Sequence, residues 1–325
     1  MRAYGPPRFH VRTPPVTFPR VPVASSTPAT SGRSARSSYR ALLGDLTALT
    51  KPGITRLVAF TTASGYLMAA GMDTSILALL NTVVGAALAS AGANALNMWW
   101  ERDTDAAMRR TRARPLPAGR VSPRLALAFA GSISVLGLLY LAIFVNLATL
   151  VLVAVSLSAY VLVYTPLKRR THHSTLIGAV PGALPTLAGW AAAGQPIGLS
   201  ALALFGVVFF WQMPHFYALA WVYREDYDRG GLRMLSVVDT SGSRITVEST
   251  LYSVALLVSS LVLVWTGLVG WIYGAGAALL GGVMVALSVR MWAERTDQRA
   301  WHLFFGSIGY LPILLILMLL DRFLI

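Results

Sequence analysis

Nine long apolar runs dominate the chain and favour a bundle of membrane-spanning helices over any other architecture. A hydrocarbon core needs roughly 20 apolar residues per helix, and these runs lack the short alternating pattern of a membrane barrel. A hydrophobic content of 55%, with 12% charged residues, is far from that of a water-soluble domain. We therefore predict an all-α polytopic membrane bundle. The expected spans are 54–72, 77–100, 124–145, 146–164, 174–193, 199–223, 246–269, 271–292 and 301–321.

The basic residues predict the orientation of this bundle. Lys and Arg are retained on the cytoplasmic side of short loops. Of the 27 in this chain, all but Arg322 fall in the N-terminal segment or in the loops after the second, fourth, sixth and eighth spans. The N-terminus is therefore expected in the cytoplasm. The net charge of +14 follows from this topology and from attraction to the lipid bilayer, so no nucleic-acid partner is expected.

The N-terminal residues 1–45 have a composition of their own. They are rich in Pro, Ser, Thr and Arg, and their first acidic residue is Asp45. Such a segment cannot bury a core and predicts a disordered cytoplasmic tail, followed by one transmembrane domain over 46–325. A mitochondrial transit peptide is the alternative, but the prolines would break the amphipathic helix it needs. The excess of Arg over Lys favours a bacterial inner membrane over a mitochondrial one.

The first polar cluster follows the second apolar run and reads NMWWERDTDAAMRRTRARP, residues 97–115. Asn97, Glu101 and Asp105 are spaced by four residues, which places three oxygen ligands on one helical face. Mg²⁺ prefers such ligands and completes its shell with water and substrate phosphate. The alternative is a solvated helix end whose acids pair with neighbouring arginines.

A second acidic cluster, YREDYDRGG, follows the sixth span and contains Glu225 and Asp226. It is expected on the same side of the membrane as the first. Two acidic clusters accompanied by arginines, among them Arg110 and Arg114, favour metal ions between which a diphosphate is clamped. Because the chain has no cysteine, only oxygen and imidazole ligands are available for a metal.

Two further polar groups have both a structural and a functional interpretation. Lys168, Arg169 and Arg170 follow the fourth span and either anchor the topology or bind an anion. Beside them, His172 and His173 point in different directions on a helix, which disfavours joint metal ligation. His215 lies deep in the sixth span, where an ionisable residue is either a functional group or a hydrogen-bonded core histidine.

Together these motifs resemble the UbiA-type intramembrane prenyltransferases. The first signature of that family is Asn-x-x-x-Asp-x-x-x-Asp followed by Arg-Thr-x-x-Arg-Pro-Leu. Here it reads Asn97, Glu101 and Asp105, then Arg110-Thr111 and Arg114-Pro115-Leu116, with Glu101 where the family has Asp. The segments YTPLKRRT, WQMPHFYALAW and YREDYDRGGLRML make the chain similar to the haem-directed branch of the family.

The resemblance implies nine helices around a central cavity, capped by the motif loops on the cytoplasmic side. It implies transfer of the farnesyl group of farnesyl diphosphate to a vinyl group of haem b, with addition of water, to give haem O. Mg²⁺ is the implied cofactor and a downstream haem A synthase an implied partner. The implied metal ligands are Asn97, Glu101, Asp105, Glu225 and Asp226. The implied substrate-binding residues are Lys51, Arg110, Arg114 and Lys168 for diphosphate, Arg169 and Arg170 for diphosphate or haem propionates, and His215 for haem. Asp105, Arg110 and His215 are the implied catalytic residues.

Two other functions fit part of the pattern. A prenyltransferase of the same family that acts on a quinone precursor or a chlorophyll-type pigment would share the first motif. A nine-span transporter would also bury polar residues, but it should carry inverted repeats and polar groups reachable from both sides. The near absence of charge from the outer loops favours an enzyme.

Overall fold

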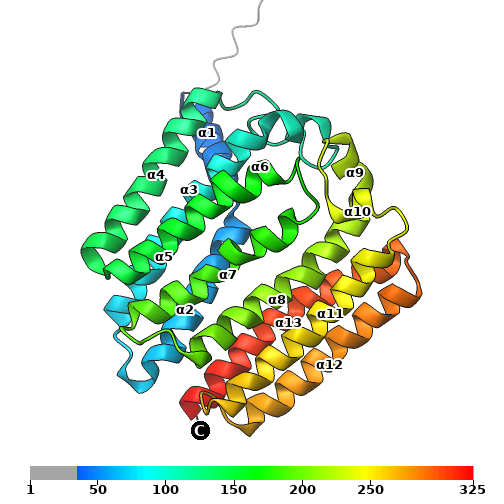
Figure 1. Ribbon diagram of the computed structural model, residues 1–325. Coiled ribbons are helices and arrows are strands. Elements are labelled where there is room, and N and C mark those ends of the chain that lie inside the picture. Colours follow the sequence, from blue (N-terminus) through cyan, green and yellow to red (C-terminus); the bar gives the residue numbers. More distant parts are fainter. Residues whose placement is uncertain (1–34, 325) are drawn as a thin grey trace, which may run out of the picture.

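The computed structural model describes residues 35–324, and within that part of the chain all regular structure is helical, as predicted. The long helices lie side by side in one bundle (Figure 1). The helices are α1 (Ala35–Leu49), α2 (Pro52–Ala70), the 3₁₀ turn η1 (Gly71–Asp73), α3 (Ile76–Ala107), α4 (Pro123–Phe144), α5 (Leu147–Ser158), the π-helix η2 (Ala159–Tyr164), α6 (Thr165–Leu167), α7 (Ser174–Ala192), α8 (Leu199–Val222), α9 (Arg224–Arg229), α10 (Leu235–Val238), α11 (Ser243–Trp265), α12 (Trp271–Ala293) and α13 (Asp297–Leu324).

Eight helical segments of the described chain are long and apolar enough to cross a membrane. They coincide with eight of the nine expected spans, with α5, η2 and α6 forming one continuous segment. The ninth expected span, 54–72, is α2, which has 19 residues but carries Arg56 and hydroxyl side chains such as Thr61 and Thr62. The count of nine spans and the cytoplasmic N-terminus therefore stay predictions.

The outer surface of the bundle is apolar along its length. Large side chains such as Leu136, Ile143 and Leu147 are 57%, 71% and 72% exposed. Such a surface would associate in water but suits a hydrocarbon solvent, and the helices satisfy their own backbone hydrogen bonds. The protein is therefore a multi-pass membrane protein.

Helices α2 and α7 approach each other through glycine. A Cβ atom at Gly189 would overlap the carbonyl oxygen of Thr62, and one at Gly65 would overlap that of Thr186. Small residues at a helix crossing allow close backbone contact inside a membrane, where packing rather than water drives association. This crossing fixes α2, and with it the segment that precedes α2, against the middle of the bundle.

Substituting Gly189 with alanine should destabilise the bundle by about 1–3 kcal/mol, the usual cost of overpacking, because α2 and α7 would have to separate. Thermal unfolding in detergent measures the effect as a lower Tm. Gly53→Ala is the matched control on α2, since a Cβ atom there would meet nothing within 4 Å. Equal Tm values for the two variants would contradict the close crossing.

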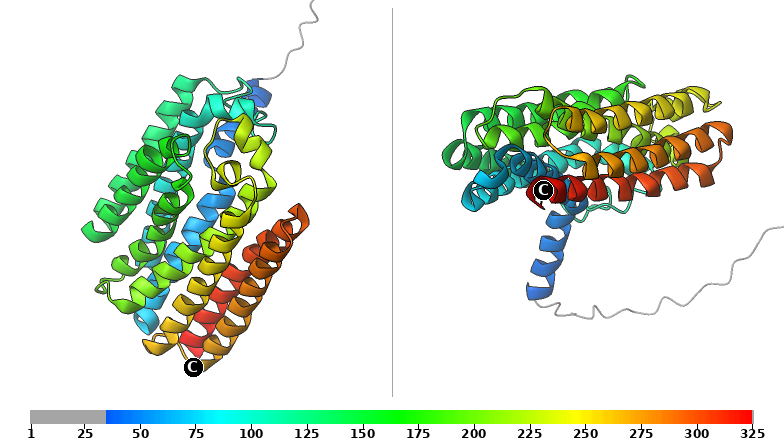
Figure 2. Two further views of the ribbon diagram at one scale, coloured as in Figure 1. Left: turned by 45° about the vertical axis from the view of Figure 1, so that its right-hand side comes forward. Right: turned by 90° about the horizontal axis from the view of Figure 1, so that it is seen from below.

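The two ends of the bundle differ. Helices α1, α6, α9 and α10 gather at one end, and the C-terminus lies at the other (Figure 1). Helix α1 projects away from the bundle (Figure 2), and its last residue, Leu49, is buried. Residues 1–34 of the expected tail, 1–45, lie outside the described part of the chain. Its remainder, 35–45, was predicted to be disordered but is part of helix α1.

Candidate active site

Three polar side chains interrupt the apolar sequence of α3 near its C-terminal end. Asn97, Glu101 and Asp105 recur every four residues and so lie along one face of the helix. All three are buried, with relative exposures of 0%, 9% and 1%. Burying carboxylates is costly unless they are paired and hydrogen-bonded. The partners of this face therefore determine what it can do.

Two lysines from distant segments bind the first two of these side chains. Lys51 donates a hydrogen bond to Oδ1 of Asn97 at 2.6 Å, and Lys168 donates to Oε1 of Glu101 at 2.7 Å. Burial lowers the pKa of Lys51 to about 7, although the charge of Glu101 opposes this effect. Burial also disfavours the charged form of Lys168, but the ion pair with Glu101 outweighs it and raises the pKa of Lys168. Both ammonium groups thus adjoin the polar face of α3.

Lys51 also has an unusual backbone conformation. It precedes α2 and has a φ of 48°, the one positive value among the non-glycine residues of the described chain. A left-handed conformation at such a residue costs of order 1–3 kcal/mol and is often found at functional sites. Here it joins α1 to α2 at the residue whose side chain reaches Asn97.

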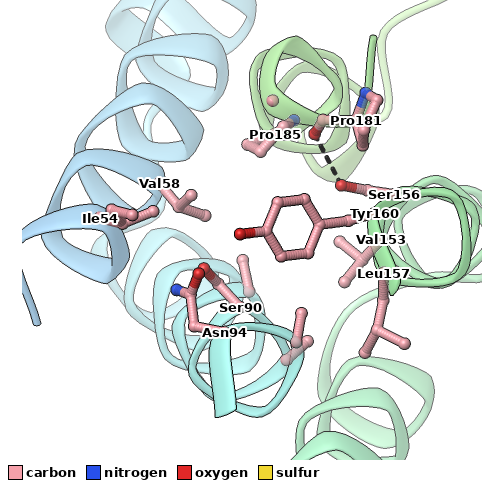
Figure 3. Close-up of a pocket in the computed structure, with 14 residues that line it drawn as sticks. Ile54, Val58, Ser90, Asn94, Val153, Ser156, Leu157, Tyr160, Pro181 and Pro185 are labelled. Carbon is pink, nitrogen blue, oxygen red and sulfur yellow. Dashed lines mark hydrogen bonds between the residues drawn. The ribbon is translucent and has the colours of Figure 1, made fainter. Parts of the chain in front are cut away.

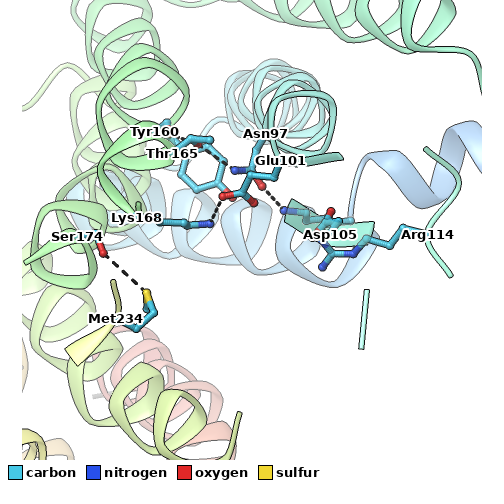
Figure 4. Close-up of polar contacts among 10 residues, drawn as sticks. Asn97, Glu101, Asp105, Arg114, Tyr160, Thr165, Lys168, Ser174 and Met234 are labelled. Carbon is cyan, nitrogen blue, oxygen red and sulfur yellow. Dashed lines mark hydrogen bonds and ion pairs between the residues drawn. The ribbon is translucent and has the colours of Figure 1, made fainter. Parts of the chain in front are cut away.

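The third side chain, Asp105, binds the loop that follows α3. Nη1 of Arg114 donates to both carboxylate oxygens of Asp105, at 2.8 and 2.7 Å (Figure 4). The hydroxyl of Thr111 donates to the backbone carbonyl of Asp105 at 2.9 Å. The Arg-Thr-x-x-Arg segment therefore folds back on the helix that carries the acids.

Two residues of this site were not singled out from the sequence. Nδ2 of Asn97 donates to Oγ1 of Thr165 at 2.9 Å, and Thr165 in turn donates to the carbonyl of Tyr160 at 2.8 Å. Tyr160 belongs to the π-helix η2, a local widening that is frequent at functional sites. The apolar sequence of this segment gives no signal for a π-helix, and the position of Thr165 beside Lys168 was the only available indication.

An apolar pocket of about 90 Å³ adjoins the polar face. The ring of Tyr160 projects into it toward Val58 of α2 and Asn94 of α3 (Figure 3). Most of its other lining is aliphatic and comes from α2, α3, α5 and α7. Basic side chains and an apolar pocket thus meet at Tyr160, an arrangement that suits an anionic group attached to a hydrocarbon chain.

Asp226 of the second acidic cluster contacts the loop after α3. Its Oδ1 and Oδ2 accept hydrogen bonds from the backbone N–H groups of Arg109 and Arg110, both at 3.0 Å, and Arg229 also donates to it. Burial alone would raise the pKa of Asp226, but these donors outweigh burial and lower it. Asp226 therefore fastens α9 to the first motif loop. Its neighbour Glu225 is exposed.

The donor set on α3 fits Mg²⁺ in chemistry. An amide oxygen and two carboxylates on one face are hard oxygen ligands. Within residues 35–324, however, no three His, Asp or Glu side chains gather closely enough to hold a metal by themselves. Glu101, Asp105 and Asn97 would together provide part of the coordination shell of Mg²⁺, and oxygen atoms of the substrate would complete it. Metal ligation by Glu225 and Asp226 stays a prediction.

Of the other expected substrate-binding residues, three are exposed at the same end of the bundle. The guanidinium of Arg110 lies over the ring of Tyr223, 5.0 Å from its centroid. Arg169 and Arg170 follow Lys168 and are exposed, so both are accessible to an anion at the edge of the site.

His215 lies elsewhere. Its Nδ1 is 2.8 Å from Oγ of Ser307 on α13, and its ring stacks between Trp211 and Phe304. The structure thus places it in the interface of α8 with α13 and not beside the polar face of α3. A role for His215 in contacting haem or positioning water stays a prediction.

The sequence matches a known family over most of its length. The profile of the UbiA prenyltransferase family covers residues 58–309. A protoheme IX farnesyltransferase of Solibacter usitatus is 42% identical over 287 residues, which is 86% of this chain and 98% of the relative. A protoheme IX farnesyltransferase of Symbiobacterium thermophilum is 45% identical and covers 85% of this chain and 93% of its own.

Solved structures share the fold. A digeranylgeranylglyceryl phosphate synthase has a TM-score of 0.74 at 17% identity, covering 87% of this chain and 99% of its own. A UbiA homologue from Archaeoglobus fulgidus, bound to GPP and Mg²⁺, has a TM-score of 0.60 at 15% identity, covering 84% and 99%. At these identities the likeness extends to the helical architecture alone.

Proposed function

Because the chain belongs to the UbiA prenyltransferase family, we propose that it transfers the farnesyl group of farnesyl diphosphate to a vinyl group of haem b. Addition of water then gives haem O, with diphosphate as the other product. The names of relatives at 42% and 45% identity support this choice of substrates. The observation that carries the proposal is the buried acidic face of α3, contacted by the basic side chains of Lys51, Lys168 and Arg114 and adjoining an apolar pocket.

The polar face would bind the diphosphate end of the donor. Asn97, Glu101 and Asp105 would hold Mg²⁺, which when bound supplies positive charge to the leaving diphosphate. Lys51 and Lys168 lie against the same face of α3 and would donate hydrogen bonds to diphosphate oxygens. Hydrogen bonds position both amino groups before the substrate arrives, so they can stabilise the charge that develops on the departing group without reorganising.

The part of the farnesyl chain next to the diphosphate would enter the apolar pocket lined by Val58 and Val153, whose volume of about 90 Å³ holds only part of the chain. As the bond to the diphosphate breaks, the allylic carbon becomes cationic beside the ring of Tyr160. An aromatic face attracts such a cation, and the aliphatic lining keeps water away from it until the vinyl group of the acceptor adds.

The loop after α3 would complete the diphosphate site from the cytoplasmic end. Arg114 is held by Asp105, and Arg110 is held through its backbone by Asp226. In this proposal Asp226 positions the loop. We further infer that the protein lies in a bacterial inner membrane and hands haem O to a haem A synthase.

The function is tested by incubating the purified protein with haem b, farnesyl diphosphate and Mg²⁺ and analysing the products by mass spectrometry. Haem O should accumulate and should be absent when EDTA replaces Mg²⁺. A folded, haem-binding preparation that instead prenylates a quinone precursor would show that the acceptor is wrong. Product formation in EDTA would contradict the metal requirement alone.

A further inference from the structure

A second pocket lies on the flank of the bundle where α8 packs between α7 and α11 (Figure 1). It has a volume of about 440 Å³, within the range of roughly 300–1,000 Å³ that is typical of small-molecule sites. Its lining comes from His173, which precedes α7, and from α7, α8 and α11, so it shares no residue with the polar face of α3. We call it the flank pocket.

Aromatic rings form much of its apolar wall. The rings of Phe210 and Tyr252 are stacked, with centroids 6.3 Å apart and planes at 28°, and Tyr217 lies 6.2 Å from Tyr252. Leu251 lines the same pocket and is 62% exposed, so the pocket borders the surface that faces lipid. Flat aromatic walls suit a planar apolar ligand that arrives from the bilayer.

One polar group of the pocket is positioned to receive an anion. Oε1 of Glu248 accepts from Nε of Arg244 at 2.7 Å, and Oε2 accepts from the hydroxyl of Tyr217 at 2.6 Å. Glu248 is thus engaged on both oxygens. Glu248 fixes the guanidinium through Nε, and the Arg244 side chain is 50% exposed. No hydrogen bond joins its terminal amino groups to an acceptor within residues 35–324, so they are available to a carboxylate ligand.

His173 adds a ligand for a metal centre. It lines the pocket from the turn that precedes α7 and is exposed. A neutral imidazole is the commonest protein ligand of haem iron. An aromatic wall, a guanidinium and an imidazole in one pocket are the groups that bind the three parts of an iron tetrapyrrole: its macrocycle, its propionates and its iron.

We propose that the flank pocket is the site at which the haem acceptor first binds from the bilayer. This inference rests on the proposed function for the identity of the tetrapyrrole. His173 of the pocket and Lys168 of the active site belong to one turn, 168–174, which the segment 233–234 holds in place. There the N–H of Arg233 donates to the carbonyl of Lys168 at 2.8 Å, and the hydroxyl of Ser174 contacts Sδ of Met234 at 3.8 Å (Figure 4). Haem bound beside His173 thus lies next to the turn that carries Lys168.

The test is a titration of the purified full chain, in nanodiscs of zwitterionic lipid, with haem b. Binding is monitored by the Soret absorbance. His173→Ala and Arg244→Gln should each weaken binding by about tenfold or more, and His173→Ala should also alter the Soret maximum. Iron-free protoporphyrin should respond to Arg244→Gln alone. His172→Ala is the matched control, because the ring of His172 lies 4.0 Å from that of His173, centroid to centroid, but does not line the pocket.

Unchanged haem affinity in both variants, or equal loss in the His172 control, would overturn the proposal. So would loss of haem binding when phosphatidylglycerol is added, because the pocket would then be an anionic-lipid site. Haem O assays separate this result from the proposed function. Normal product formation with an unchanged KM for haem in both variants refutes the flank pocket alone, whereas absence of product from the unmodified protein refutes the function.

Discussion

Replacing Asp105 with asparagine should slow haem O formation by about a hundredfold or more. The amide keeps the size of the side chain but loses the negative charge that binds Arg114 and, in the proposed function, Mg²⁺. Loss of one preorganised electrostatic group in an active site commonly costs 10²- to 10³-fold in rate. The rate and the Mg²⁺ concentration at half-maximal activity should be measured together, and the latter should rise.

Asp103→Asn is the control for this variant. Asp103 lies on the same helix, but its side chain is 82% exposed and, within residues 35–324, forms an ion pair only with Arg102, at 3.7 Å. We expect activity close to that of the unmodified protein. Arg114→Gln separates the two roles of Asp105: if it lowers the rate without changing the Mg²⁺ dependence, Asp105 does more than hold Arg114. Full activity of Asp105→Asn would contradict a metal-binding role for Asp105 and leave it only its ion pair with Arg114.

Most of the fold could be predicted because the bilayer imposes one solution on a long apolar run. The helix positions of α3, α7 and α12 agree with the expected spans to within a few residues, apart from the polar extension of α3. Prediction was weaker where composition and structure diverge. Helix α1 forms within a segment whose Pro and Ser content argued against structure, and hydropathy did not indicate the crossing of α2 on α7 through glycine.

The site could be predicted only as far as local spacing reaches. Four-residue spacing identified the face of α3, but the partners of that face are 46 residues away for Lys51 and 67 for Lys168. Spacing and composition mark such lysines only as loop cations, and it was the family resemblance that implied a role for both in binding diphosphate. His215 was selected because it is ionisable within a span, yet its contact with Ser307 depends on which face of α8 meets α13, and periodicity does not reveal that.

The second acidic cluster shows the same limit of prediction, because the sequence does not reveal the partners of its acidic side chains. An acid-rich loop on the expected cytoplasmic side predicted a metal site, because residue type and loop position were the only available indications. In the structure, both oxygens of Asp226 accept backbone N–H groups from the loop after α3. Gly230 adjoins the same loop, and a Cβ atom there would come within 3.1 Å of the side chain of Met108. Both contacts indicate that the segment 226–230 packs against the loop after α3. A variant at Asp226 tests this contact.

Asp226→Ala should release the loop that carries Arg110 and Arg114 and lower kcat/KM for farnesyl diphosphate by about ten- to a hundredfold. The distinguishing measurement is limited trypsin digestion without Mg²⁺. Arg109, Arg110 and Arg112 are exposed on this loop, and cleavage there should accelerate once their backbone is free. Asp226→Asn, which keeps one acceptor oxygen, should give an intermediate rate of cleavage.

Glu225→Gln is the matched control for the digestion. Glu225 lies on the same short helix but is exposed, so the cleavage pattern of this variant should not change appreciably. Because the digestion contains no metal, a simple ligand role for Asp226 predicts no effect there and a higher Mg²⁺ requirement in the activity assay. Normal trypsin resistance combined with that higher requirement would assign Asp226 to the metal. Faster cleavage with an unchanged Mg²⁺ requirement would assign it to the loop, which makes α9 a structural support for the arginines that meet the diphosphate.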